Sequence, residues 1–205
     1  MYLIITASIE NRFTSINSNR KQEYTDAITE TLLHLPAEIQ PIIVENNGES
    51  TIFLDEFKHN NETVPVLYTY NNMRSINNKG MIELLDIKAV IDYYNIKDTD
   101  MIIKLSGRYT VKSPRFFNEV LKGNADAFIK FFNVCTRVFD SNDSVLGLYA
   151  VQCHLLRYWS HLTMNYNNPE MAFAHHIRRN TQNICEIQFL DLECNFANDG
   201  TRLRV

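Results

Sequence analysis

The stretch MIIKLSGRY, residues 101–109, decides the fold of this 205-residue chain. Residues 101–105 are mostly apolar without alternation, which is typical of a β-strand buried on both faces inside a sheet. The polar turn that follows would lie at the carboxyl edge of that sheet, where open α/β folds bind their ligands. Gly107 and Arg108 in this turn predict a phosphate or another anion held over the sheet. An ordinary loop with one solvated arginine is the alternative interpretation.

The residues before this strand alternate between strand and helix patterns. Apolar runs predict strands at 2–7, 41–44 and 64–70, and helical spacing of apolar residues predicts helices at 23–35, 53–57 and 79–94. Asn77 and Asn78 are suitable caps for the helix at 79–94. This alternation predicts a parallel sheet with right-handed crossovers, as in a Rossmann-like open α/β fold.

The residues after this strand follow a less regular pattern. Helices are expected at 113–120, 155–165 and 170–179, and strands at 127–134, 144–152, 187–194 and 202–205. Strands that do not alternate with helices predict antiparallel additions to the sheet. We therefore expect an α/β fold with an open mixed sheet, parallel in its N-terminal half, and with helices on both faces. The length suits a single domain over residues 1–205.

The composition is that of a soluble globular protein, with 45% hydrophobic and 21% charged residues. A net charge of −4 and the lack of a basic block argue against a nucleic-acid partner.

No stretch approaches the length of a membrane span, and the first residues lack the regions of a signal peptide, so we expect a cytoplasmic protein. The four cysteines show no metal-like spacing and are expected to be small buried residues.

Four strand ends would meet at one edge of the predicted parallel sheet. They carry polar residues suited to a nucleotide, namely Thr6 and Ser8 with Arg12, then Glu45 with Asn46, Asn47 and Gly48, then Asn71 and Asn72, and finally Ser106, Gly107 and Arg108. Lys79 at a helix N-terminus suits a diphosphate, because the free backbone N–H groups of that helix end also attract anions. The sequence has neither a GxGxxG fingerprint nor a P-loop, which argues against a dehydrogenase and an NTPase.

Six segments carry a family likeness, namely residues 77–80 (NNKG), 83–88 (ELLDIK) and 104–109 (KLSGRY), and later 130–135, 144–150 and 194–200. They resemble segments of virus-encoded GT-A glycosyltransferases. The chain is similar to small proteins of large DNA viruses, including the rhamnosyltransferase-like domain of the viruses that infect chlorella algae. The resemblance covers most of the chain. It implies a GT-A fold with a nucleotide-binding half at about 1–110 and an acceptor half at about 111–205, in the host cytoplasm if the chain is viral.

The resemblance also implies an activity, the transfer of a hexose or deoxyhexose from a nucleoside-diphosphate donor to a glycan acceptor. UDP is the expected donor nucleotide. The nucleoside site would consist of Thr6, Ser8, Arg12 and Glu45, and the diphosphate site of Lys79, Lys104, Ser106, Gly107 and Arg108. Asp86 would cap or contact the nucleoside, or else pack through a buried salt link. His176 would lie near the diphosphate, or else be a half-buried structural histidine.

Most GT-A enzymes bind a divalent metal, Mn²⁺ or Mg²⁺, through an Asp-x-Asp motif after the fourth strand. The match in this chain, Asp98-Thr99-Asp100, precedes that strand, so we expect it at the opposite edge of the sheet. The position after the strand holds Arg108, whose guanidinium can neutralise a diphosphate directly. This departure argues against metal dependence. The departure also supports an alternative function, a non-catalytic module that binds a nucleotide sugar or a glycan. A separate alternative is that the chain is one domain of a longer polypeptide with several domains.

Glu170 is the predicted catalytic base, because it opens a helix beside an expected acceptor site. A glutamate after Pro169 is also favourable there simply because of the helix dipole. The rival carboxylates are Asp126, Asp143 and Asp191. Tyr158 and Trp159 are expected either to stack on a sugar or to pack in the core.

Overall fold

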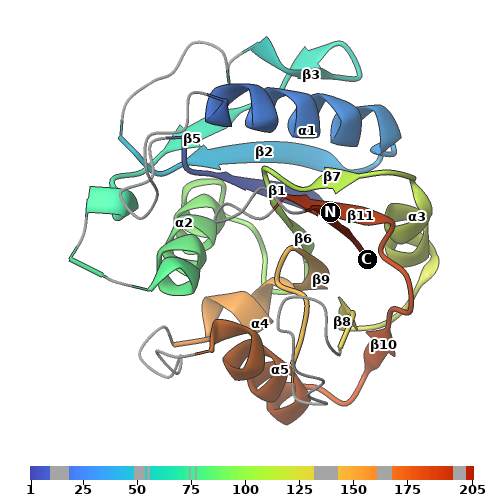
Figure 1. Cartoon of the computed structure of the whole chain (residues 1–205). Coiled ribbons are helices and arrows are strands. Elements are labelled where there is room, and N and C mark those ends of the chain that lie inside the picture. Colours follow the sequence, from blue (N-terminus) through green and yellow to red (C-terminus); the bar gives the residue numbers. More distant parts are fainter. Residues whose placement is uncertain are drawn as a thin grey trace.

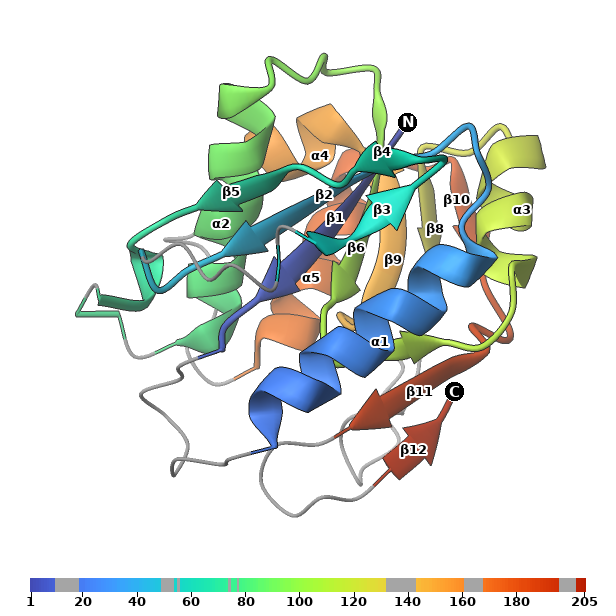
Figure 2. The ribbon, with the colours of Figure 1, turned by 90° about the horizontal axis from the view of Figure 1, so that it is seen from above.

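The structure is a computed structural model that describes residues 1–9, 19–48, 54, 56–73, 75, 76, 78–131, 143–160, 168–195 and 202–205. A seven-stranded sheet forms its centre. Helices α2 (Lys79–Tyr93), α4 (Cys153–Arg157) and α5 (Pro169–Asn180) cover one face of the sheet, opposite α1 (Arg20–His34), as Figure 1 shows. Helix α3 (Arg115–Lys122) packs on the same face as α1, and Figure 2 shows α1 running roughly along the direction of β1.

The sheet has the strand order β10-β8-β9-β6-β1-β2-β5. Strands β6 (Met101–Ser106), β1 (Tyr2–Ala7), β2 (Gln40–Glu45) and β5 (Val66–Tyr68) are parallel. Strand β9 (Leu148–Gln152) runs antiparallel between β6 and β8 (Ala127–Ile129), and β10 (Ile184–Glu186) is parallel to β8. The predicted open mixed sheet, parallel in its N-terminal half, is confirmed.

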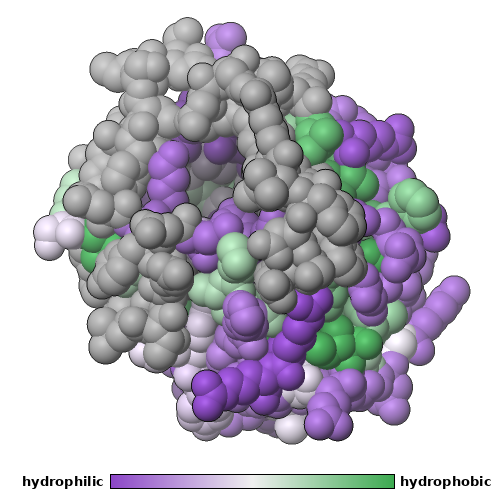
Figure 3. All heavy atoms as spheres, turned by 60° about the horizontal axis from the view of Figure 1, so that its bottom comes forward, coloured by the Kyte–Doolittle hydropathy of each residue, from purple (hydrophilic) through white to green (hydrophobic). Residues whose placement is uncertain are grey.

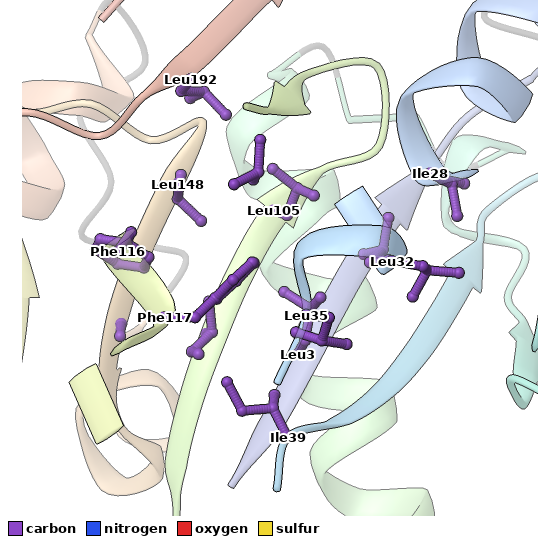
Figure 4. Packing of buried hydrophobic residues seen from close by; sticks show 14 of the residues in the cluster. Leu3, Ile28, Leu32, Leu35, Ile39, Leu105, Phe116, Phe117, Leu148 and Leu192 are labelled. Carbon is purple, nitrogen blue, oxygen red and sulfur yellow. The ribbon is translucent and has the colours of Figure 1, made fainter. Parts of the chain in front are cut away.

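The sheet is apolar on both faces because it is covered on both. In β1, Leu3 and Ile5 point into a cluster with α1 and α3, while Ile4 between them points into a second cluster with α2, α4 and α5. Figure 4 shows the first cluster, in which Leu3, Leu105 and Leu148 from neighbouring strands lie beneath residues of α1 and α3. Full burial of each such side chain stabilises the fold by about 1.5–3 kcal/mol.

Two segments differ from the sequence-based expectation. A hairpin of β3 (Lys58–His59) and β4 (Glu62–Thr63) precedes β5, with Asn60 and Asn61 at its turn in the left-handed region, at φ 51° and 65°. Residues 187–194 do not form one strand. Strand β11 (Leu192–Asn195) belongs to a separate antiparallel sheet with β7 (Thr110–Val111) and β12 (Arg202–Arg204), and Asp191, at φ 49°, interrupts the extended chain just before it.

The remaining differences concern the lengths of elements. The strand expected at 144–152 begins only at Leu148, and the helix expected at 155–165 is a short helix that ends at Arg157, with 161–165 outside the described residues. Most of the helix expected at 53–57 and the end of the strand expected at 127–134 also lie outside them. None of the helices in the described part of the chain is both long and apolar enough to cross a membrane.

The surface shown in Figure 3 is mainly polar. Among the residues coloured there, hydrophilic ones predominate and hydrophobic ones form small, separate patches. Such scattered apolar groups are normal on a folded domain and do not by themselves mark an interface.

Candidate active site

A cavity of about 520 Å³ lies at the carboxyl edge of the parallel strands. Its volume is in the range of small-ligand sites, which is about 300–1,000 Å³. The ends of β1 and β6 and the first turns of α2 and α5 line it. Eight residues predicted from the sequence meet in this cavity, namely Thr6, Ser8, Lys79, Asp86, Ser106, Gly107, Arg108 and Glu170. Arg12, predicted to bind the nucleoside, lies outside the described residues.

The N-termini of two helices converge on the cavity. Asn78 caps α2 by accepting a hydrogen bond from the N–H of Met81 at 3.1 Å, and Asn168 caps α5 in the same way. Gly80 allows the two helices to approach, because a Cβ atom there would lie 2.8 Å from the side chain of Pro169. The cavity therefore faces the positive ends of two helix dipoles, which favours a bound anion.

Three cationic side chains, Arg20, Lys79 and Arg108, also line the cavity. Burial lowers the pKa of both Arg20 and Lys79, and repulsion from Arg108 lowers each further. Cations held together in this way are stabilised by an anion between them, and guanidinium groups match phosphate oxygens well. The arrangement is suited to a diphosphate.

Arg20 was not predicted from the sequence. Its Nε donates to the carbonyl oxygens of Ser8 at 2.9 Å and Ile9 at 3.0 Å, so it fixes the start of the loop after β1. Tyr24, one turn later, accepts a hydrogen bond from the N–H of Ser8 at 3.0 Å. The available sequence clue was that Arg20 falls on the same helical face as the apolar residues of α1, where an arginine needs partners.

The turn after β6 folds back against the end of β1. The N–H of Gly107 donates to the carbonyl of Thr6 at 2.9 Å. A Cβ atom at position 107 would lie 2.9 Å from that same oxygen and 3.0 Å from the ring of Tyr24. Only glycine fits this approach without displacement. The close contact keeps the following residue, Arg108, at the edge of the cavity.

Lys104 lies beneath the cavity and does not line it, which corrects the prediction that it binds the diphosphate. Its side chain is 1% exposed. The ammonium is hydrogen-bonded to Glu83 Oε1 at 2.7 Å, Ser106 Oγ at 2.8 Å and the carbonyl of Leu146 at 2.6 Å. These three bonds use all its donors, so Lys104 supports the floor of the site through Glu83 and Ser106.

Glu83 is a further cavity residue that the sequence did not single out. Its Oε1 accepts from the hydroxyl of Thr6 at 2.6 Å as well as from Lys104, and it is 27% exposed. It follows Lys79 by four residues on α2, so the two lie on the same face of the helix. That spacing was the clue to its position.

Glu45 is also not part of the cavity lining, contrary to its predicted contact with the nucleoside. Its carboxylate is 1% exposed and accepts hydrogen bonds from the N–H groups of Ile9 and Asn47, each at 3.3 Å. Burial raises the pKa of Glu45 to about 7, and these hydrogen bonds oppose the increase. Glu45 therefore joins the loop after β1 to the end of β2.

Asp86 lies at the deep end of the cavity in a polar network and not in a salt link. It accepts hydrogen bonds from Thr69 Oγ1 at 2.6 Å, Asn71 Nδ2 at 2.7 Å and Asn46 Nδ2 at 3.1 Å. Burial raises the pKa of Asp86 to about 6, against the effect of its three donors. The carboxylate thus orients the side chains around it.

Glu170 also lines the cavity, in the first turn of α5. Burial raises its pKa, and the negative charges of Asp143 and Glu83 raise it further. A cavity carboxylate with a raised pKa is suited to proton transfer. Among its rivals, Asp126 is bound by Gln152 and Thr181, and Asp191 by Ser113; neither lines the cavity.

His176 lies away from this cavity, so its position does not support a contact with the diphosphate. It lines a separate depression, where its Nε2 is 2.7 Å from the carbonyl oxygen of Leu155 and its ring stacks on Trp159 at 5.3 Å. Burial lowers the pKa of His176. Trp159 is 4% exposed and packs against Phe173, as expected for a core residue.

The Asp98-Thr99-Asp100 segment precedes β6, as predicted, and lies outside the cavity. Asp98 Oδ1 accepts from Arg157 Nε at 2.7 Å, and Asp100 Oδ2 from the N–H of Lys97 at 2.9 Å. Within the described residues, no cluster of three His, Cys, Asp or Glu side chains is suited to a metal ion. In the cavity lining, the turn after β6 contributes Ser106, Gly107 and Arg108 and no carboxylate.

Comparison with solved structures places this architecture among known folds. The chain is similar to the galactosyltransferase LgtC in complex with donor and acceptor sugar analogs, with a TM-score of 0.57 and 10% identity over 91% of this chain and 73% of that chain. An active-site mutant of LgtC gives a TM-score of 0.58 and 10% identity, over 91% and 72%. HddC from Yersinia pseudotuberculosis gives 0.54 and 14%, over 91% and 89%. No protein-family model matches the sequence, nor does any curated protein. The chain has a GT-A-like fold of the Rossmann type.

Proposed function

We propose that this chain is a glycosyltransferase that uses a nucleoside-diphosphate sugar as donor. The observation that carries the proposal is the cavity itself, which three cations (Arg20, Lys79 and Arg108) and the Glu170 carboxylate line together at the carboxyl edge of a GT-A-like sheet. The similarity to a galactosyltransferase solved with donor and acceptor sugar analogs supports this choice among the functions that such a fold can host.

The cations and the two helix N-termini would hold the diphosphate. When the bond between the sugar and the diphosphate breaks, negative charge grows on the departing phosphate oxygens. Arg108 and Lys79 are already fixed beside the cavity and would stabilise this charge without reorganisation. In this proposal they take the place that a metal ion has in other enzymes of the GT-A type.

Glu170 would act as the base for the acceptor. Its raised pKa favours uptake of a proton from an attacking hydroxyl group, which then forms the new bond to the sugar. Lys104 keeps Glu83 and Ser106 in place beneath the donor and is a positioning residue.

The finer assignments also belong to the proposal. The donor nucleotide is UDP, the transferred group is a hexose or deoxyhexose, and the acceptor is a glycan. Residues up to about 110 would bind the nucleotide and those from about 111 the acceptor. Thr6 and Ser8 at the end of β1 would contact the nucleoside.

A second candidate function is a binding module that holds a nucleotide sugar without turnover. The presence of Arg108 at the position of a metal motif favours it, because the loss of metal ligands is one way in which a GT-A domain could lose activity. Release of nucleoside diphosphate from a bound donor separates the two functions, since only the enzyme produces it.

The test uses titration calorimetry of UDP and common UDP-sugars with the full chain and two variants. Arg108→Ala should weaken binding by about tenfold or more, because a hydrogen bond to a charged group contributes about 1.5–3 kcal/mol. Asp100→Ala is the control, since its side chain lies outside the cavity. Equal binding by Arg108→Ala and the unaltered chain would contradict the proposed diphosphate site.

A further inference from the structure

The deep end of the cavity contains an unpaired buried oxygen atom, Oδ1 of Asn46. Asn46 follows β2 and is 6% exposed. Its backbone is fixed on both sides, because its N–H donates to the carbonyl of Ala7 at 3.3 Å and its carbonyl accepts from the N–H of Asn72 at 3.1 Å. Asn46 is part of the cavity lining, and its Oδ1 has no hydrogen-bond partner in the described part of the chain.

The orientation of this amide is determined by Asp86. An ionised carboxylate can only accept hydrogen bonds, so the amide nitrogen of Asn46 must face Asp86 Oδ2, 3.1 Å away. Thr69 and Asn71 donate to the other oxygen of Asp86 and hold it in place. The amide oxygen of Asn46 therefore remains without an internal donor. Buried polar atoms are nearly always paired, so this oxygen marks a place for a ligand that carries a donor.

The distance from the cations indicates which part of the ligand reaches Asn46. Asp86 follows Lys79 by seven residues on α2, which is about 10 Å along the helix axis at about 1.5 Å per residue. With the diphosphate at Lys79 and Arg108, the ribose lies between, and the group beside Asn46 and Asp86 is the nucleobase.

We infer that Asn46 Oδ1 accepts a hydrogen bond from a ring N–H of the nucleobase, with Asp86 as the positioning residue. Uracil, thymine and guanine carry such an N–H on their hydrogen-bonding edge. Cytosine and adenine carry a lone pair at that ring nitrogen, which would face the oxygen unfavourably. The inference rests on the proposed function and names the chemical class of its donor, a nucleoside diphosphate with a ring N–H donor.

The decisive ligands are two pairs of nucleotides, and the members of each pair differ only by a methyl group on this ring nitrogen. Calorimetry with the full chain compares UDP with 3-methyl-UDP, and GDP with 1-methyl-GDP, and includes CDP and ADP. The parent base that binds should lose about tenfold or more in affinity on methylation, because the hydrogen bond is lost and the buried oxygen stays unpaired. CDP and ADP should bind more weakly than that parent by a similar factor.

Two variants assign the effect to the amide oxygen. Asn46→Ala should bind the parent and the methylated nucleotide with similar affinities, both lower than the affinity of the unaltered chain for the parent nucleotide. Asn183→Ala is the control, because it also removes an asparagine amide, whose Nδ2 donates to the carbonyl of Asn124 at 2.9 Å, but lies outside the cavity and away from Asp86, and it should retain the discrimination. If Asn46→Ala does not fold, the ligand pairs with the unaltered chain still decide the question.

The outcomes also separate this inference from the proposed function. Equal affinity for a parent nucleotide and its methylated form, or preferred binding of CDP or ADP, overturns the role of Asn46 and leaves a nucleotide-sugar site in place. Failure of every nucleoside diphosphate to bind overturns both. Loss of discrimination in Asn183→Ala as well as in Asn46→Ala would show an indirect structural effect and overturn the contact with Asn46.

Discussion

Replacement of Lys104 by methionine tests the charged support beneath the site. The ammonium of Lys104 is 1% exposed and is paired with Glu83 at 2.7 Å, with two further acceptors at 2.6 and 2.8 Å. Methionine has a similar length and no charge, so it fills the space but leaves the Glu83 carboxylate and the Leu146 carbonyl without this donor. We expect the variant to fold with reduced stability.

The magnitude follows from the burial of the pair. Removal of one partner of a buried ion pair costs about 3–5 kcal/mol. Glu83 is 27% exposed, so water partly compensates its charge, and we expect a loss near the lower end, about 3 kcal/mol. The double variant Lys104→Met with Glu83→Gln removes both charges. Its loss should be smaller than the sum of the single losses by about 1–3 kcal/mol.

The assay is denaturation by urea, monitored by circular dichroism, with unfolding free energies taken from midpoints and slopes. The control is Lys112→Met, since Lys112 is also 2.7 Å from its partner Glu30, but the two side chains are 29% and 40% exposed. An exposed pair contributes about 1 kcal/mol or less. If Lys104→Met costs no more than Lys112→Met, or if the double variant shows additive losses, the structural reasoning is refuted.

Four further predictions concern the site and its surroundings. Glu170→Gln should lower kcat by about 100-fold or more and leave donor affinity within about twofold, measured by nucleotide release and calorimetry; an unchanged kcat would rule out its role as base. Burial raises the pKa of Glu45 to about 7, above its ordinary 4.5, so its contribution to stability is fully present below pH 4.5 and is lost, by about 3 kcal/mol, as pH rises through 7. Denaturation between pH 4 and 8 should show a shallower slope in Glu45→Gln, in which the buried Asp86 still titrates with a pKa of about 6, and an equal slope in both proteins would contradict the assignment. Gly107→Ala, whose Cβ would lie 2.9 Å from the Thr6 carbonyl, should lower stability by about 1–3 kcal/mol and weaken donor binding; an unchanged Tm contradicts it. His176→Ala should lower stability by about 1–2 kcal/mol without changing donor affinity, and a tenfold loss of affinity would place His176 in the site.

Much of the fold was predictable because its signals are local. The apolar runs of β1, β2 and β6 and the helical spacing of α1 and α2 each arise within a few residues. The parallel arrangement then places the strand ends together, which is why Thr6, Ser106 and Arg108 could be expected at one cavity. The placement of Leu192–Asn195 in a separate sheet, with residues 187–191 outside any strand, could not be predicted in this way, because it depends on the pairing of β11 with β7 and β12.

The functions of individual charged residues were less predictable, because burial and partners decide them. Lys104 and Glu45 follow the expected pattern of polar residues near strand ends, but each is 1% exposed and bound by groups beneath the cavity. Glu83 and Arg20 carry no motif, yet both line the cavity because their helical faces turn toward it. A sequence records neither the depth of a side chain nor the direction in which its helix faces.

By itself, the sequence determined the alternation of β1, α1, β2, α2 and β6, the parallel sheet that they form and the edge at which a ligand would bind, since hydrophobic periodicity and strand direction fix these features. Only the tertiary structure decided which polar groups face the cavity. The clearest example is Asn46, an ordinary turn residue in the sequence. Its amide oxygen remains unpaired at the base of the cavity because Asp86, forty residues later in the chain, binds its nitrogen. Long-range contacts of this kind determine which atoms are left to recognise a ligand.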